Sequence, residues 1–366
     1  MKKIMLISPR DNNFYNFRGE LILKLRKEGK DVILVCPYGH KIDYFTDRGC
    51  RFIEVQVDRR GMNPLNDLKL IFNYYKIISD EKPEIVLTYT SKPSIYGGIV
   101  CKFLKVPYIV NNAGLMKSNF ILDKFMNLLY GISFNKACCI MYQNKYEKDV
   151  LNRILKNRVH YQLIPGSGVN LENYNYSLYP DDDCIVFNFV ARIVKIKGID
   201  EFLECAKTIK REFPNTKFVV YGDYDDDGYR NIINSYEQQG YIEYGGILLD
   251  MKPAIKKAHA VIHPSYYEGM TNVILEHSAM GRVCIGSDVP GVADAIEDNK
   301  TGYVFECKNV QSLISKVRQF LNLTREEKIQ MGRAARTKME EEFDRNLVTK
   351  AYLREINNVL NSKGRV

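Results

Sequence analysis

The chain has 366 residues, 45% of them hydrophobic, and this length favours two domains because single cores rarely grow past about 250 residues. Its 53 lysine and arginine residues outnumber 44 aspartate and glutamate residues, and the net charge of +9 is scattered along the sequence. This distribution argues against a nucleic-acid-binding protein, whereas it suits an anionic substrate or an acidic membrane surface.

The nine cysteines include no Cys-x-x-Cys pair and mostly fall in apolar runs, so we expect buried free thiols and a reducing compartment. The apolar run in "MKKIMLISPR" stops after four residues, which is too short for a signal peptide. No stretch approaches the roughly 18 apolar residues of a membrane span. The sequence therefore predicts a cytoplasmic protein, with peripheral attachment to the inner face of the cell membrane.

Short apolar runs alternate with helical periodicity, which is typical of parallel sheets covered by helices. After a first strand in "KIMLIS", Phe17, Leu21 and Leu25 share one face of a helix that ends at Gly29. Further strands of this half are predicted at residues 31–36, 52–57, 83–89, 107–112, 138–142 and 159–164.

The alternation restarts after the polar stretch "GVNLENYNYSLYPDDD", which marks a second domain of the same α/β class. Ile199, Phe202 and Ile209 share a face of its first helix, and residues 309–362 are almost wholly helical in pattern. Its strands are predicted at residues 184–190, 217–222, 260–265, 283–287 and 302–305. We expect two open parallel sheets that face each other across a cleft, where ligands bind beyond the strand ends.

Two carboxylates stand out in "SYYEGMTNVILEHSAMG", residues 265–281. Glu268 follows a predicted strand, and Glu276 lies about one turn inside the next helix. Between them, the amides of Gly269, Met270, Thr271 and Asn272 are expected to be free at a helix N-terminus, with Thr271 or Asn272 as the capping residue. Such a terminus favours a phosphate group. The alternative is a solvated loop carboxylate and a solvated helix carboxylate.

The Glu-x7-Glu spacing of this stretch closely resembles the motif of retaining glycosyltransferases of family 4, which have the GT-B fold. The segments "ARIVKIKGIDEFLECA", "GSGVNLENY" and "VPGVADAIEDNKTGYVF" are similar to further elements of that family. In the first half, "NFYNFRGELILKLRKEGKDVILVCP", "GMNPLNDLKLI" and "YTSKPSIYGGIVCKFLKVPYIVNNAGL" are similar to the branch that builds capsular polysaccharides, O-antigens and lipid-linked glycans. The resemblance covers essentially the whole chain.

The resemblance implies a GT-B fold of two Rossmann-like domains with a central cleft. Residues 1–168 would form the N-terminal acceptor-binding domain, and residues 169–344 the C-terminal domain that binds the nucleotide sugar. Residues 345–366 would form a C-terminal helix that returns to the first domain.

Residue by residue, Arg192 and Lys197 match the pair that contacts the donor diphosphate in the family, a task that suits a guanidinium fork and an ammonium charge. Glu276 matches the glutamate that binds the ribose hydroxyls, and Glu268 the one near the donor sugar, where a negative charge favours an oxocarbenium-like transition state. The sequence departs from the family pattern at Tyr266–Tyr267, His277 and Ser278, and these departures leave the motif intact.

In the first domain, Arg18 and Lys92 are placed to meet the phosphates of a polyprenyl-linked acceptor. The alternatives are an arginine that begins an amphipathic helix and a solvated loop lysine. Many family members have a histidine near the reacting sugar, but "VNNAGL" offers Asn111 and Asn112, so no catalytic residue is assigned to this domain.

Asp225, Asp226 and Asp227 could be mistaken for the metal site of the other glycosyltransferase fold, because oxygen ligands suit magnesium or manganese. An acidic surface turn is the simpler interpretation, and the positive groups of the donor site can neutralise a diphosphate, so we expect no metal and no other cofactor. His263 is interpreted as a strand residue, and no Gly-x-Gly-x-x-Gly follows the first strand.

The predicted function is transfer of a sugar, a hexose or N-acetylhexosamine, from a UDP-sugar to a polyprenyl-diphosphate-linked glycan in surface polysaccharide or glycoconjugate synthesis. Two alternatives stay open: a nucleotide-sugar epimerase of the same architecture, and a non-catalytic module that binds a sugar nucleotide or a membrane. The basic segments "KLRKEGK" and "VDRRGMNP" suggest contact with an anionic membrane surface, and no nucleic-acid partner is expected.

Overall fold

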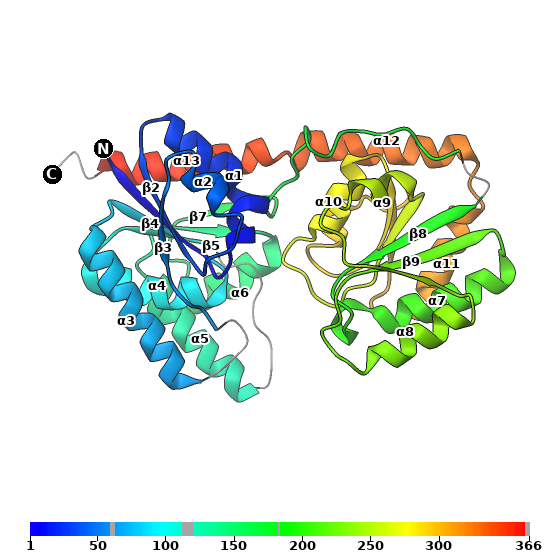
Figure 1. Ribbon diagram of the computed structural model, residues 1–366, viewed down its shortest axis with the longest axis horizontal. Helices are drawn as coiled ribbons and strands as arrows, with labels where there is room; N and C mark the ends of the chain where they lie inside the picture. Colours follow the sequence, from blue (N-terminus) through cyan, green and yellow to red (C-terminus); the bar gives the residue numbers. More distant parts are fainter. Residues whose placement is uncertain (59–62, 112–119, 182–183, 363–366) are drawn as a thin grey trace. The chain divides into compact units, whose positions relative to one another are not determined.

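The computed structural model describes residues 1–58, 63–111, 120–181 and 184–362, and the side chains of 120–122 are left out of the description. It divides into two compact units, unit 1 (Met1–Ser167 and Asn346–Val366) and unit 2 (Gly168–Arg345). Each unit has a parallel sheet with helices packed against it, as Figure 1 shows. The predicted α/β class with two Rossmann-like halves is confirmed.

Unit 1 is built on a parallel sheet of seven described strands in the order β3-β2-β1-β4-β5-β6-β7. These strands are β1 (Lys3–Ile7), β2 (Asp31–Cys36), β3 (Arg51–Glu54), β4 (Ile85–Tyr89), β5 (Tyr108–Asn111), β6 (Cys139–Tyr142) and β7 (Tyr161–Leu163). Its helices are α1 (Asp11–Lys27), α2 (Asp43–Thr46), α3 (Pro64–Glu81), α4 (Ser91–Leu104), α5 (Phe120–Phe134), α6 (Lys145–Leu155) and α13 (Arg345–Ser362). The strand order reverses at β1, which pairs with both β2 and β4.

The two faces of the unit 1 sheet are covered by different helices. Ile4 and Leu6 of β1 pack in one core with α1 and α13, while Ile7 faces the other side, where Gly97 of α4 lies close to it. Helix α4 touches both α3 and α5 on that side. The helix α1 begins at Asp11, six residues before the predicted Phe17, because Phe14 is buried in the same core.

Helix α13 packs back on unit 1, as predicted for the C-terminal helix. Its side chains Val348, Tyr352, Ile356 and Leu360 are buried in the core that also holds Leu6. Burial of apolar surface contributes roughly 25 cal/mol per Å², so this row of side chains ties the end of the described chain to its beginning.

Unit 2 has a parallel sheet of six described strands in the order β10-β9-β8-β11-β12-β13. The strands are β8 (Ile185–Val190), β9 (Thr216–Tyr221), β10 (Glu243–Gly246), β11 (Ala260–His263), β12 (Val283–Ser287) and β13 (Gly302–Phe305). The helices are α7 (Ile199–Glu212), α8 (Tyr229–Gln238), α9 (Lys252–Lys257), α10 (Asn272–Ala279), α11 (Val310–Leu321) and α12 (Arg325–Glu342), with the 3-10 turns η1 (Lys195–Lys197) and η2 (Ala293–Ala295). β11 lies at the centre of the sheet, and its carboxyl end leads directly into the Glu268 loop.

All nine cysteines are free thiols, as expected, but only six are buried. Cys138, Cys184 and Cys307 are partly exposed, so the expectation of burial is wrong at these three positions. Across the described residues, no helix combines the length and the apolar character that crossing a bilayer requires.

Candidate active site

The loop between β11 and α10 carries the Glu268 motif, and close backbone packing fixes its shape. Gly198, which follows η1, has a φ of +74°, and a Cβ there would lie 2.1 Å from the carbonyl oxygen of Pro264. The amide of Tyr266 donates to the carbonyl of Ile196 at 2.9 Å, so the η1 turn is bonded to this loop. Glycine permits this approach, and the approach brings Lys197 beside Glu268.

Glu268 is held by two basic side chains. Nζ of Lys197 donates to its Oε1 at 2.6 Å, and Nε2 of His263 lies 3.1 Å from the same oxygen. The side chains of Lys197 and Glu268 are 17% and 15% exposed. Burial acts to raise the pKa of Glu268, but the hydrogen bond from His263 and the charge of Lys197 outweigh it and lower the pKa to about 2. Glu268 is therefore a fixed negative charge at neutral pH.

The N-terminus of α10 lies just beyond Glu268. The helix begins after Thr271, whose side chain makes no capping bond. The amide of Thr271 donates to the carbonyl of Gly291 at 3.1 Å, so the expectation of a free amide is wrong at this residue. Met270 belongs to the core under α10 through its side chain. The helix N-terminus itself, with Asn272 as its first residue, is where an anion would be stabilised.

Glu276 lies in α10 and is partly buried. Burial raises the pKa of its carboxyl group to about 7, while a hydrogen bond from the hydroxyl group of Tyr174 and the charge of Arg345 oppose that shift. Glu276 therefore changes charge near neutral pH, which sets it apart from Glu268.

His277 and Ser278, where the sequence departs from the family motif, point into the core of unit 2. They are 1% and 2% exposed, and Nδ1 of His277 lies 2.8 Å from the carbonyl of Val273. Burial lowers the pKa of His277 to about 3, so this histidine is neutral. Both residues are packing residues of α10.

Arg192 follows β8, and its guanidinium group forms an ion pair with Asp225. A residue predicted to bind the donor is therefore paired with an aspartate of the acidic turn. The side chain of Arg192 is 52% exposed. In the same turn, Asp226 accepts from the amide of Gly228 at 2.9 Å, and Asp227 pairs with Arg230 at 2.9 Å. The aspartates thus bind arginines and their own turn, as in the surface-loop interpretation.

The two predicted acceptor residues are both engaged within unit 1. Arg18 is 4% exposed in the middle of α1, its guanidinium carbon lies 5.1 and 5.2 Å from the ring centroids of Tyr89 and Tyr352, and it donates to Asn111 at 3.4 Å. It therefore does not begin a helix. Lys92, in the first turn of α4, forms an ion pair with Asp67 at 2.7 Å and is not a solvated loop residue. Asn112 lies outside the described residues.

Sequence reasoning missed two polar neighbours of the carboxylates, His263 and Tyr174. His263 does end β11, as expected for a strand residue, but its ring also contacts Glu268. The sequence could have indicated this contact, because His263 lies at the end of β11, only five residues before Glu268. Tyr174 is separated from Glu276 by more than 100 residues, and no local pattern connects them.

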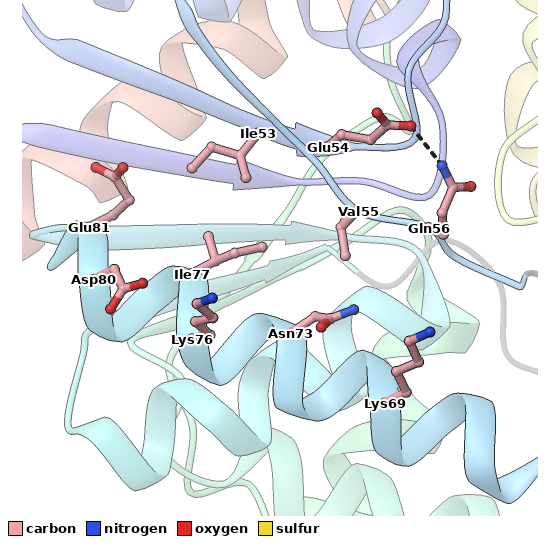
Figure 2. A pocket seen from close by; sticks show the side chains of 10 residues that line it. All are labelled: Ile53, Glu54, Val55, Gln56, Lys69, Asn73, Lys76, Ile77, Asp80 and Glu81. Atoms are coloured by element: carbon pink, nitrogen blue, oxygen red, sulfur yellow. Dashed lines mark hydrogen bonds between the residues drawn. The ribbon is translucent and has the colours of Figure 1, made fainter.

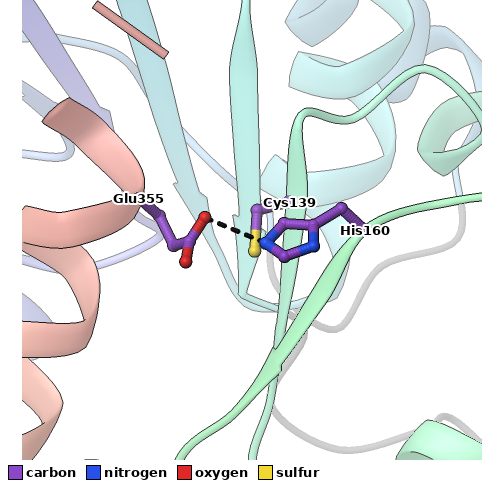
Figure 3. A group of neighbouring side chains, drawn as sticks. All are labelled: Cys139, His160 and Glu355. Carbon is purple, nitrogen blue, oxygen red and sulfur yellow. Dashed lines mark hydrogen bonds and ion pairs between the residues drawn. The ribbon is translucent and has the colours of Figure 1, made fainter. Parts of the chain in front are cut away.

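Figure 3 draws a group of three side chains of unit 1, Cys139, His160 and Glu355. Each offers one metal-ligand atom, and these atoms lie within 4.8 Å of one another. Nε2 of His160 is already bonded to Oε2 of Glu355 at 3.0 Å. Burial raises the pKa of the Cys139 thiol to about 12, and this sulfur lies 3.7 Å from the sulfur of Met141. A metal needs the thiolate. We interpret the group as a neutral core thiol beside a hydrogen-bonded pair that links α13 to the residue before β7.

A groove between β3 and α3 has a volume of about 640 Å³. Figure 2 shows the side chains that line it. Lys69 and Lys76 of α3 line one side, and Glu54 lies on the other. None of the predicted site residues lines this groove.

Residues 175–338 match the family model "Glycosyl transferases group 1", and residues 3–144 match "Glycosyl transferase 4-like". The chain belongs to this family of glycosyltransferases.

Individual relatives agree with this assignment. The chain is 23% identical to the Campylobacter jejuni N,N'-diacetylbacillosaminyl-diphospho-undecaprenol alpha-1,3-N-acetylgalactosaminyltransferase over 98% of this chain and 99% of the relative. It is 24% identical to the Escherichia coli UDP-Gal:alpha-D-GlcNAc-diphosphoundecaprenol alpha-1,3-galactosyltransferase over 80% of each chain.

Solved structures show the same fold. A glycosyltransferase from Rickettsia africae matches with a TM-score of 0.80 at 19% identity, covering 98% of both chains. Anabaena Alr3699/HepE in complex with UDP matches with a TM-score of 0.79 at 12% identity, covering 98% of this chain and 100% of that one. These likenesses confirm the GT-B fold class, whereas the cleft stays a prediction.

Proposed function

We propose that this chain is a retaining glycosyltransferase that moves a hexose or N-acetylhexosamine from a UDP-sugar to a polyprenyl-diphosphate-linked glycan. The observation that carries the proposal is the pair Lys197–Glu268 beside the N-terminus of α10, with Glu276 one turn further along. The site combines positive groups, which suit a diphosphate, with two carboxylates: Glu268 is ionised at neutral pH, and Glu276 titrates near pH 7.

In this proposal each residue has one task. The N-terminus of α10, Lys197 and Arg192 stabilise the donor diphosphate, and an ammonium bonded once to Glu268 has two further N–H donors. Glu276 accepts hydrogen bonds from the ribose hydroxyls. Glu268 lies near the transferred sugar, where its charge stabilises positive charge that develops at the anomeric carbon. The proposal includes no metal, because Lys197, Arg192 and the N-terminus of α10 supply positive charge to the diphosphate.

The choice of substrates rests on the relatives. The Campylobacter jejuni and Escherichia coli enzymes are named for diphospho-undecaprenol-linked glycans, and the latter for UDP-Gal. The Anabaena structure of similar fold contains UDP. We propose the same classes of donor and acceptor here, with the surface polysaccharide or a related glycoconjugate as the product.

The test is transfer from labelled UDP-sugars to an undecaprenyl-diphosphate-linked saccharide, with the anomeric configuration of the product read by NMR. An α-linked product from an α-linked donor supports retention, and inversion contradicts it. A UDP-sugar converted to its epimer without acceptor would identify an epimerase. Donor binding without transfer or UDP release to any acceptor would favour the non-catalytic module.

A lipid-linked acceptor would bring the enzyme to an anionic membrane surface, and the sequence offered two basic segments for that contact. "KLRKEGK" covers the end of α1 and the turn after it, where Lys24 and Lys27 are exposed. Of "VDRRGMNP", residues 59–62 lie outside the described residues. Both segments stay proposals, and binding to vesicles as a function of salt tests them.

A further inference from the structure

An exposed apolar stripe runs along α3. Leu65, Leu68, Phe72 and Tyr75 are 75%, 62%, 65% and 39% exposed. They recur every three or four residues and therefore share one face of the helix, while Leu70, Tyr74 and Ile78 are buried on another. A contiguous apolar patch on the outer face of a helix is typical of an interaction site.

The stripe continues over the neighbouring helices. Phe103 at the end of α4 is 74% exposed, and its ring centroid lies 6.0 Å from that of Tyr75. Nζ of Lys102 donates to the carbonyl of Ile132 in α5 at 3.3 Å. On α5, three side chains at helical spacing are exposed: Phe125 at 54%, Leu128 at 59% and Ile132 at 41%. We name these eight apolar side chains the α3–α5 face. Figure 1 shows the three helices that carry it.

Charge is distributed unevenly between the two units. Unit 1 has 31 lysine and arginine residues against 16 aspartate and glutamate residues, a formal net charge of +15. Unit 2 has 22 against 28, a net charge of −6. The overall value of +9 therefore hides a strongly basic unit, and this unit carries the α3–α5 face.

Exposed lysines surround the face. Asp67 is partly buried and paired with Lys92. Among the described residues of α3, α4, α5 and the turns that follow them, Asp80 is the one acidic residue that is exposed. Against it, the exposed lysines of the same segments are Lys69, Lys76, Lys82, Lys105, Lys124 and Lys136. Lysine stems lie along apolar surface while their ammonium groups reach outward, an arrangement that suits the boundary between acyl chains and phosphates.

We propose that the α3–α5 face docks onto an anionic lipid bilayer, with its leucine and phenylalanine side chains in the headgroup region and its lysines on lipid phosphates. A second copy of the chain is a poorer occupant, because pairing this face with itself would bring two units of charge +15 together. The proposal deepens the membrane partner of the proposed function, since it names the surface that meets the lipid. The proposal rests on that function only for the reason why the protein would bind a membrane.

The experiment is co-sedimentation of the full chain with vesicles of phosphatidylcholine alone or with one third phosphatidylglycerol. We expect binding to the anionic vesicles, and the double variant Leu68→Ser/Phe72→Ser should lower the partition coefficient tenfold or more. The matched control is Leu178→Ser/Leu249→Ser, which removes two leucines of unit 2 that are 86% and 106% exposed. The control should bind as the unchanged protein does.

Unchanged vesicle binding by Leu68→Ser/Phe72→Ser would overturn the proposal, as would a dimer in solution that this variant abolishes. Thermal unfolding and UDP affinity are measured for every variant and should not change. If the double variant lowers the unfolding temperature, vesicle binding is measured instead for Phe103→Ser and Leu128→Ser on the neighbouring helices. Unchanged binding by these two variants would then overturn the proposal. A variant that no longer binds vesicles can still bind the donor and transfer sugar to a detergent-dispersed acceptor. The membrane face and the glycosyltransferase function are therefore tested separately.

Discussion

The fixed charge of Glu268 leads to a prediction about turnover. Glu268→Gln removes the charge but keeps the shape, so we expect kcat to fall on the order of 100-fold with a smaller change in the donor KM, because the charge acts on the transition state. Steady-state kinetics with a UDP-sugar measure both constants. Glu243→Gln on β10, whose carboxylate pairs with Lys217, is the matched control. A larger effect on KM than on kcat would contradict this role.

Glu276 should make donor binding depend on pH. Its folded pKa of about 7 exceeds the ordinary value of 4.5, so its contribution to stability is full below pH 4.5 and is lost as pH rises through 7. The ribose needs the carboxylate, and the ionised fraction falls about tenfold from pH 8 to pH 6. We therefore expect UDP-sugar affinity, measured by calorimetry, to fall by up to about tenfold over this range.

Glu276→Gln supplies the comparison. The amide cannot titrate, so donor affinity should be flat between pH 6 and 8 and weaker by roughly 10- to 100-fold at pH 8, the loss of a charge-assisted hydrogen bond. A variant that keeps the pH dependence of the unchanged protein would assign that dependence to another group.

At the scale of elements, the contact between η1 and the Glu268 loop depends on Gly198. Gly198→Ala combines an unfavourable positive φ with a clash against Pro264, so it should lower both the free energy of unfolding and donor affinity. Gly240→Ala is a close control, because Gly240 also has a φ of +74° but nothing within 4 Å of the added Cβ. It should cost only about 1 kcal/mol of stability. Thermal melts and UDP titrations compare the two variants.

Elements with a strong apolar pattern were predictable from the sequence. Runs such as "DVILVC" give strands buried on both faces, and the restart after residue 183 follows from the same pattern. Side-chain partners were not predictable in the same way. The Thr271 amide is occupied by the carbonyl of Gly291, and Arg18 lies against Tyr352, more than 300 residues away. These contacts depend on tertiary packing, which no local periodicity encodes.

For the whole molecule, we expect activity without a divalent metal. Transfer should persist in excess EDTA, because Lys197, Arg192 and the N-terminus of α10 neutralise the diphosphate. The measurement is initial rate before and after chelation, with magnesium or manganese added back. Activity that EDTA abolishes and magnesium restores would return attention to the turn of Asp225, Asp226 and Asp227.

The chain order of unit 1 has a consequence for synthesis on the ribosome. Its core needs α13, but the 178 residues of unit 2 are translated between Ser167 and Asn346. At about 5–20 residues per second, the strands of unit 1 wait roughly 10–35 s for their last helix. During this interval, the surface that Tyr352 and Ile356 later cover is open to solvent. Unit 2 can fold as soon as its own segment has emerged, whereas unit 1 cannot complete its core until α13 has been translated.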